Sequence, residues 1–394
     1  MREAVIVDAV RSPLGKRKGG LSGVHSADLL AHVLESLVSR TGIDPGQVDD
    51  VIGGCVVQVR EQAGNVTRNA WLGAGFPDTV PATTIDRQCG SSQQAAHFGA
   101  QGVMAGAYDL VVACGVESMS RLSMFAHIGD ANPYGERMLA RYSKRLVHQG
   151  VCAEFVAHRW GVTRDEADTI ALQSHHRAAA ARESGAFQAE IAPVAVVVDG
   201  EKRLIAMDEG IRDTSTEQLA ALKPAFRTDE VAARHPELEW IVTAGNASQM
   251  ADGAAAILIA TPEMCAELSL TPRWRFREFA VVGSDPTTML TGVIPATQRV
   301  LARAGMSIGD IDHFEISEAF APVIGAWLRE TGADLAKVNP RGGGIALGHP
   351  TGASGARLMT TLVHALAQSG GRFGLQAMCE GGGTANATII ERIS

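Results

Sequence analysis

The chain carries the same order of landmarks twice. Residues 42–54, GIDPGQVDDVIGG, align with residues 305–317, GMSIGDIDHFEIS, as a glycine, a cap-like stretch and a Val/Ile-Asp pair that leads into a strand. Each copy continues into small residues and an Ala-rich helix, and then into a strand with a cysteine near its end, Cys114 or Cys379. Three landmarks in one order indicate an internal duplication, so the chain must fold as two similar halves.

The duplication also makes a geometric prediction. Cys89 lies 40 residues after Asp49, and His349 lies 37 residues after Asp312. Two copies of one fold that pack about a pseudo-twofold axis bring equivalent loops together. We therefore expect Cys89 and His349 to face each other, although 260 residues separate them in the chain.

Apolar runs such as AVIVDAV, DLVVACG and AAAILIA alternate with Ala-rich helical stretches, which predicts an α/β protein with buried sheets. We expect an N-terminal half at residues 1–119, to which residues 250–270 return, and a C-terminal half at residues 271–394. Between them, residues 120–249 are rich in Arg, His and Met. We expect this segment to be an inserted loop domain that lies over the site and recognises the substrate.

Composition excludes several classes of protein. The 394 residues carry a net charge of −8, and the one short basic run, GKRKGG, does not predict binding to nucleic acid. No apolar run is long enough for a membrane span, and the N-terminal sequence does not resemble a secretory signal. The six cysteines are scattered without a CxxC pair or zinc-type spacing. We expect a reduced, cytoplasmic protein without a metal site.

Cys89 precedes GSSQQA, which is typical of a helix start. Free N–H groups and the helix dipole favour a thiolate at such a place and lower the pKa of the thiol. From this segment alone, an inert core cysteine is the equal alternative. Two glycine-rich segments favour the functional interpretation.

The first segment, residues 339–357, places His349 between a glycine and a proline, in a loop whose glycines let the backbone approach a ligand closely. The second, residues 378–390, places Cys379 at a strand end before three glycines, where backbone N–H groups can point at an oxyanion. The alternative reading is a structural histidine and the last core residue before a turn. Together with Cys89, the two residues predict a site with one imidazole and two thiols.

At this point the sequence resembles the thiolase family. The segments DRQCGSSQQA, VESMS, VTAGNASQMADGAAA, EAFAP, GGGIALGHPTGASGAR and the closing Cys-x-Gly-Gly-Gly follow the family's order across essentially the whole chain. The chain is most similar to the degradative acyl-CoA thiolases of actinobacterial type. The resemblance implies a duplicated five-layer αβαβα core with an inserted loop domain. It also implies cleavage of a 3-oxoacyl-CoA with CoA, without a resident cofactor.

The resemblance implies a role for each residue of the predicted site. Cys89 would be the nucleophile that carries the acyl group, and His349 would accept its proton and then donate to the thioester oxygen. Cys379 would be the acid/base at C2 of acetyl-CoA. The N–H groups of Cys89 and Gly381 would form an oxyanion hole, in which one donor is worth about 3 kcal/mol.

The chain departs from the family at Ser317. The family has Asn-Glu-Ala-Phe where this chain has SEAF, residues 317–320. The family's Asn holds a water molecule that, with the histidine, stabilises the enolate oxygen. A serine hydroxyl has a shorter reach but keeps one donor and two lone pairs. We expect retained activity rather than altered chemistry.

For CoA and acyl-CoA, the matching family segments imply contacts that are less firmly placed. Ser248 would lie near the pantetheine, and Arg212 would be either a CoA contact or a solvated surface charge. His148 and Gln149 align with a His-Met-Gly element that lines the acyl pocket. Gln149 replaces the methionine that restricts this pocket, whereas Met289 remains.

Three alternatives are open to the same sequence. A ketoacyl synthase would share the duplicated fold but would have a histidine where Cys379 stands. A non-enzymatic thiolase-like scaffold protein is favoured only by Ser317. A redox dithiol protein would need a vicinal cysteine pair, which this sequence lacks.

Family members are homodimers or homotetramers, so we expect one of these. The acyl group is open: short, long, branched or steroid-derived.

Overall fold

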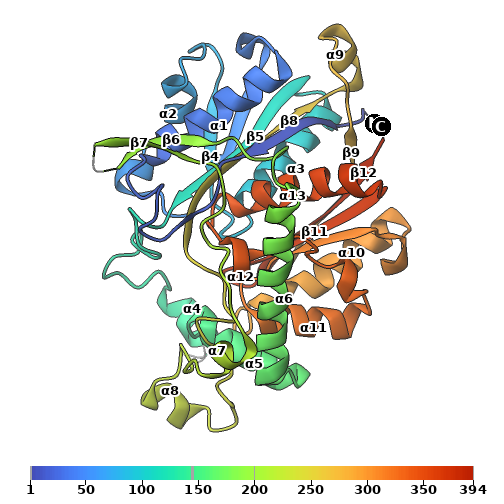
Figure 1. Ribbon diagram of the computed structural model, residues 1–394. Helices are drawn as coiled ribbons and strands as arrows, with labels where there is room; N and C mark the ends of the chain where they lie inside the picture. The colour runs from blue at the N-terminus through green and yellow to red at the C-terminus, as the bar shows by residue number, and fades with distance from the viewer. Residues whose placement is uncertain (1, 143–145, 199, 394) are drawn as a thin grey trace.

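The computed structural model describes residues 2–142, 146–198 and 200–393 (Figure 1). Its strands are β1 (Val5–Arg11), β2 (Gly15–Lys16), β3 (Asp50–Gly54), β4 (Ala82–Ile85), β5 (Leu110–Ser118), β6 (Val194–Val198), β7 (Glu201–Ile205), β8 (Ala251–Ala260), β9 (Trp274–Gly283), β10 (His313–Ile316), β11 (Phe373–Glu380) and β12 (Thr384–Arg392).

The α-helices are α1 (Ser26–Thr41), α2 (Val66–Gly73), α3 (Ser91–Ala105), α4 (Glu136–Arg141), α5 (Gln149–Trp160), α6 (Arg164–Glu183), α7 (Thr216–Ala220), α8 (Asp229–Arg234), α9 (Pro262–Glu267), α10 (Val293–Ala304), α11 (Ala321–Thr331), α12 (Gly344–Leu347) and α13 (Ser354–Ser369). Short 3₁₀ turns include η1 (Pro45–Gln47), η2 (Arg60–Gln62), η3 (Leu290–Gly292), η4 (Ile308–Asp310) and η5 (Leu335–Lys337).

The main sheet has the strand order β10-β11-β12-β9-β1-β8-β5-β3-β4. The pairs β3–β4, β3–β5 and β10–β11 are parallel, and the other pairs are antiparallel. Only two residue pairs, Val5–Arg275 and Ile6–Trp274, join β1 to β9. The sheet therefore divides at this narrow junction into an N-terminal part and a C-terminal part.

Helices and sheets form five layers. Helix α1 packs on the outer face of the N-terminal strands, and α10 packs on the outer face of the C-terminal strands. Between the N-terminal and C-terminal parts of the main sheet lie α3 and α13, whose small and apolar side chains share one buried core with strands of both halves. This arrangement confirms the α/β fold and its duplication.

The aligned aspartates explain why the repeat is visible in the sequence. The carboxylate of Asp49 accepts hydrogen bonds from the N–H groups of residues 109 and 110, at 2.6 and 3.0 Å, where β5 begins. The carboxylate of Asp312 accepts from the N–H groups of residues 372 and 373, at 2.7 and 3.0 Å, where β11 begins. Each aspartate thus fixes the start of the strand that carries the cysteine of its half.

The segment 120–249 packs on both halves. Helix α6 runs along the molecule in Figure 1 and packs against α11 and α12 of the C-terminal half. The chain after α6 returns to the N-terminal half, where Arg11 forms ion pairs with Glu190 and Asp208 at 2.7 Å each. Within the described ranges, no helix is both long and apolar enough to span a membrane.

Candidate active site

Cys89 lies in a tight turn between β4 and α3. Ser91 holds this turn, because its hydroxyl accepts from the N–H of Arg87 at 2.9 Å and donates to the carbonyl of Gln88 at 2.6 Å. Gln88 has a φ of +50°, a conformation that side-chain-bearing residues rarely adopt. The turn places Cys89 one residue before Gly90, the N-cap of α3.

Cys379 lies near the end of β11 and is buried. Its sulfur lies 3.9 Å from the hydroxyl of Ser317, which follows β10. The next residues of β11 contact the Cys89 turn: a Cβ on Gly90 would overlap the carboxyl of Glu380, and one on Gly381 would lie 2.9 Å from Gln88 Oε1. The structure therefore brings the two thiols into one region, and it places Ser317 beside the second thiol.

His349 is buried in the loop before α13, and its ring is held by Ser354. The Ser354 hydroxyl lies 2.6 Å from His349 Nδ1 and donates its hydrogen to the carbonyl of Pro350 at 2.8 Å. Because that hydrogen is already used, the hydroxyl must accept from Nδ1–H. Nε2 is then the unprotonated nitrogen, and it is buried without a hydrogen-bond partner among the described residues.

The helix starts that follow Cys89 and His349 are in direct contact. The N–H of Ala356 in α13 donates to the hydroxyl of Ser92 in α3 at 2.9 Å. Gly355 lies so close to Gln93 that a Cβ at this position would overlap the Gln93 backbone. The two loops predicted to face each other thus lie at adjacent helix starts, and glycine is required where the helices meet.

Glu117, at the end of β5, connects the N-terminal half to the His349 loop. Its buried carboxylate accepts from the N–H of Gly352 and from the hydroxyl of Thr351, both at 2.9 Å. It also accepts from the N–H of Val56 at 2.9 Å and from Gln62 Nε2 at 2.7 Å. A single carboxylate therefore fixes the loop two and three residues after His349.

The pKa directions correct one expectation from the sequence. The helix start predicts a lowered pKa for Cys89, but burial raises this pKa, and the neighbouring Cys379 and Glu380 raise it further. The prediction of a Cys89 thiolate is therefore wrong for the resting protein. Loss of water around the thiol raises its pKa by more than the helix start lowers it. Burial likewise raises the pKa of Cys379 to about 12, against the lowering effect of Ser317.

Burial lowers the pKa of His349 to about 4, and the nearby Arg357 guanidinium adds to this effect. At neutral pH the site therefore holds two thiols and one neutral imidazole with a free Nε2 lone pair. Such a set can transfer a proton from sulfur to nitrogen when a substrate arrives, without an initial net charge.

Two of the predicted acyl-CoA contacts lie at the start of α5. His148 caps this helix, stacks on Phe226 at 5.2 Å between ring centroids, and borders a cavity of about 420 Å³. Gln149 Nε2 lies 3.4 Å from Met124 Sδ. The cavity walls are mainly apolar, as in pockets that take organic ligands.

The other three predicted contacts are dispersed. Ser248 is half-buried, and its N–H donates to the carbonyl of Ala319 at 3.0 Å, two residues after Ser317. Met289 is buried in the same apolar core as Cys379. Arg212 has an exposed side chain whose charge acts on His175 of α6. Ser248 and Met289 therefore adjoin elements of the site, whereas Arg212 lies at the surface.

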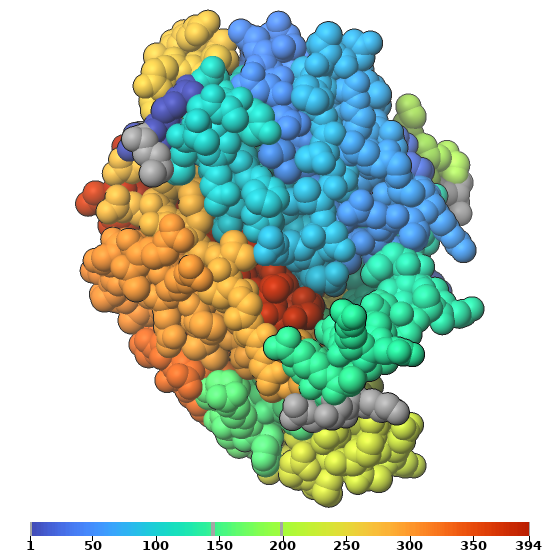
Figure 2. Space-filling view, turned by 180° about the vertical axis from the view of Figure 1, so that it is seen from behind, coloured from blue at the N-terminus to red at the C-terminus, as the bar shows by residue number. Residues whose placement is uncertain are grey.

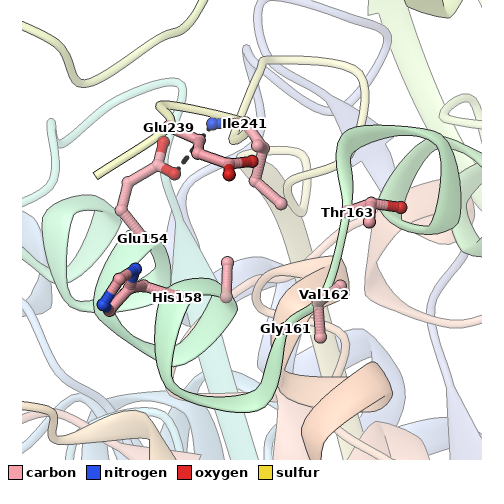
Figure 3. Close-up of a pocket in the computed structure, with 8 residues that line it drawn as sticks. Glu154, His158, Gly161, Val162, Thr163, Glu239 and Ile241 are labelled. Carbon is pink, nitrogen blue, oxygen red and sulfur yellow. Dashed lines mark hydrogen bonds between the residues drawn. The ribbon is translucent and has the colours of Figure 1, made fainter. Parts of the chain in front are cut away.

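A second cavity of about 210 Å³ lies at the other end of α5 and contains none of the predicted site residues (Figure 3). Glu154 on its wall accepts from the N–H groups of Ile241 and Val242 at 2.8 and 2.9 Å. This carboxylate therefore anchors a loop. In Figure 2, by contrast, red atoms near the C-terminal end of the chain lie at the floor of a hollow between surfaces of both halves.

Comparison with known proteins gives the family. Residues 4–263 match the thiolase N-terminal domain, and residues 270–392 match the thiolase C-terminal domain. The chain belongs to the thiolase family. Steroid 3-ketoacyl-CoA thiolase FadA6 of Mycobacterium tuberculosis is 47% identical over 100% of this chain and 95% of its own length.

Two further relatives cover the whole chain. The 3-ketoacyl-CoA thiolase of Klebsiella pneumoniae is 43% identical over 100% of both proteins. The crystal structure of the Bacillus anthracis acetyl-CoA acetyltransferase superposes with a TM-score of 0.89 at 38% identity, over 100% of this chain and 99% of that one. This thiolase is therefore an acyltransferase with the thiolase fold.

Three residues of this thiolase site were not identified from the sequence as site residues: Glu117, Ser354 and Glu380. The position of each in the sequence could have indicated its role. Ser354 lies five residues after His349, at the start of the predicted helix, and Glu380 directly follows Cys379. Glu117 is a charged residue at the end of an apolar strand run, where a buried partner is required.

Proposed function

We propose that this thiolase cleaves a 3-oxoacyl-CoA with CoA to give acetyl-CoA and a shortened acyl-CoA, through an acyl group on Cys89. The proposal is supported by the contact of the Cys89 turn with the segment of Cys379, by the adjacent helix starts that follow Cys89 and His349, and by the free Nε2 of His349. A thioester on sulfur exchanges with CoA at little energetic cost, which suits a two-step reaction.

In the first half-reaction, His349 Nε2 takes the proton of Cys89, and the resulting thiolate attacks the 3-oxo carbon. The bond between C2 and C3 breaks, which leaves the acyl group on Cys89 and an enolate of acetyl-CoA. The Cys379 thiol protonates C2 of this enolate. The hydroxyl of Ser317, 3.9 Å from the Cys379 sulfur, supports this assignment because it lowers the pKa of that thiol.

In the second half-reaction, the Cys379 thiolate takes the proton of CoA, and the CoA sulfur attacks the acyl group on Cys89. Cys89 leaves as a thiolate and recovers its proton from His349, so both half-reactions together restore the site. The N–H groups of Cys89 and Gly381 would hold the oxyanion. Their support is the contact between the Cys89 turn and residues 380–381.

For the bound CoA, we propose His148, Gln149, Ser248 and Met289 as contacts, supported by the cavity at α5 and the positions of residues 248 and 289. Arg212 has the weakest support, because it lies at the surface. We further propose that the protein is a cytoplasmic homodimer or homotetramer. Each chain would have an N-terminal half at residues 1–119 with 250–270, an inserted loop domain at residues 120–249 and a C-terminal half at residues 271–394. A ketoacyl synthase is the second candidate, and Cys379 in place of a histidine disfavours it.

The test is thiolysis of acetoacetyl-CoA and CoA, followed by the loss of the 3-oxo thioester absorbance. A panel of linear, branched and polycyclic 3-oxoacyl-CoA substrates then identifies the acyl group. Loss of absorbance with the native chain, and none with Cys89→Ala, is the expected result. Absence of thiolysis with every substrate, or decarboxylation of malonyl-CoA instead, would contradict the proposal.

A further inference from the structure

The carboxyl group of Glu380 is a buried acid that the mechanism above does not use. Glu380 is 0% exposed. Neither carboxyl oxygen accepts a hydrogen bond of normal geometry from the part of the chain that the structure describes. It follows Cys379 in β11, and its Oε1 packs against the Cα of Gly90, the residue after Cys89. The acid therefore lies between the segments that carry the two thiols.

In the described part of the chain, two charged side chains act on the pKa of Glu380. Arg87, two residues before Cys89, is the cation that acts on it, and Asp86 opposes this effect. The Thr384 hydroxyl, opposite Glu380 across the β11–β12 hairpin, provides a polar contact. A negative charge on Glu380 acts in turn on the pKa of the Cys89 and Cys379 thiols.

Burial without a full set of hydrogen bonds favours the neutral form of a carboxyl group. Burial raises the pKa of Glu380 to about 8, although Thr384 and Arg87 lower it. The group is thus protonated at neutral pH and ionises only in mildly alkaline solution. When it ionises, its negative charge raises the pKa of both thiols.

We propose that Glu380 is a positioning residue of the thiolase site: as a neutral acid it permits Cys89 and Cys379 to form thiolates, and as a carboxylate it suppresses both. The predicted effect of Glu380 on turnover rests on the proposed function. The predicted effect of Glu380 on thiol reactivity is independent of that function, because a small alkylating reagent reports on the Cys89 thiolate without any acyl-CoA.

The experiment measures the rate of Cys89 alkylation by iodoacetamide, from about pH 6 to about pH 10, with peptide mass spectrometry as the readout. Glu380→Gln mimics the neutral acid at every pH. We expect equal rates for the native chain and the variant below about pH 7, and about tenfold faster alkylation of the variant near pH 10. Glu380→Asp keeps an ionisable group and should keep the slower alkaline rate.

Two further variants complete the design. Glu391→Gln removes a buried carboxylate at the opposite end of the same hairpin, and its Cys89 rates should match the native chain. Thr384→Val removes the hydroxyl that lowers the pKa of Glu380, so it should move the alkaline suppression of Cys89 to higher pH.

Overlapping rate profiles for native, Glu380→Gln and Thr384→Val proteins, all folded by circular dichroism, would overturn the inference. In the thiolysis assay, kcat/KM of the native chain should fall above about pH 8, and that of Glu380→Gln should not. Altered alkylation without any thiolysis would refute the proposed function but leave the inference on Glu380 standing.

Discussion

Replacing Glu117 by Gln tests how the His349 loop is held. Oε2 of Glu117 accepts from three donors. Oε1 accepts from Gln62 Nε2 at 2.7 Å, from the N–H of Val57 at 3.3 Å and, more weakly, from the Cys55 thiol at 3.8 Å. An amide NH2 in place of Oε1 is the less costly choice. It removes the acceptor of two N–H donors and one weak thiol donor, whereas an NH2 in place of Oε2 would remove the acceptor of two N–H groups and a hydroxyl. Gln62 cannot flip to compensate, since its own Oε1 accepts from the N–H of Ser118 and from Ser26.

Each buried donor left without a partner costs about 1–3 kcal/mol, so Glu117→Gln should lower the free energy of unfolding by about 2–6 kcal/mol. Because the remaining oxygen still holds Thr351 and Gly352, kcat/KM should fall by less than about tenfold.

The assay is urea unfolding followed by circular dichroism, together with thiolysis kinetics of the folded variant. The matched control is Glu154→Gln, another buried carboxylate, which accepts from two backbone N–H groups in a different loop. Its substitution should orphan one donor and cost about half as much. If Glu117→Gln lost less than about 1 kcal/mol, the carboxylate would not be the group that secures this loop.

Three further predictions concern the imidazole and the second thiol. Ser354→Ala should leave His349 Nδ1–H without its acceptor and lower kcat/KM by about 10- to 100-fold. Ser354→Thr should restore kcat/KM. An unchanged rate in Ser354→Ala would refute the tautomer assigned to His349. Ser317→Asn should keep or raise thiolysis, and loss of turnover in a folded variant would show that the serine is required. Because burial lowers the pKa of His349 from 6.5 to about 4, protonation of this base should reduce kcat/KM only as the pH falls toward about 4, and an acid limb near 6.5 would contradict this.

The sequence predicted those features that repeat or that local chemistry requires. The aligned Asp49 and Asp312 predicted the duplication because each carboxylate caps the strand of its own half. The glycine loops around His349 and Cys379 predicted a site because close backbone approach needs glycine, as the contact of Gly355 with α3 shows.

The sequence could not predict effects that depend on burial in three dimensions. The helix start after Cys89 favours a thiolate locally, but loss of water and the neighbouring Cys379 and Glu380 raise the pKa of the thiol instead. The tautomer of His349 depends on the single hydrogen of Ser354, which no spacing rule reveals. Long-range partners such as Glu117 and Thr351, 234 residues apart, appear only in the fold.

Intact-protein mass spectrometry after brief exposure to acetoacetyl-CoA without added CoA tests the central claim most directly. The account predicts a mass increase of one acetyl group, located on Cys89 by peptide analysis, removed by CoA, and absent in Cys89→Ala. An unmodified Cys89, or an acetyl group carried by another residue during active turnover, would contradict it.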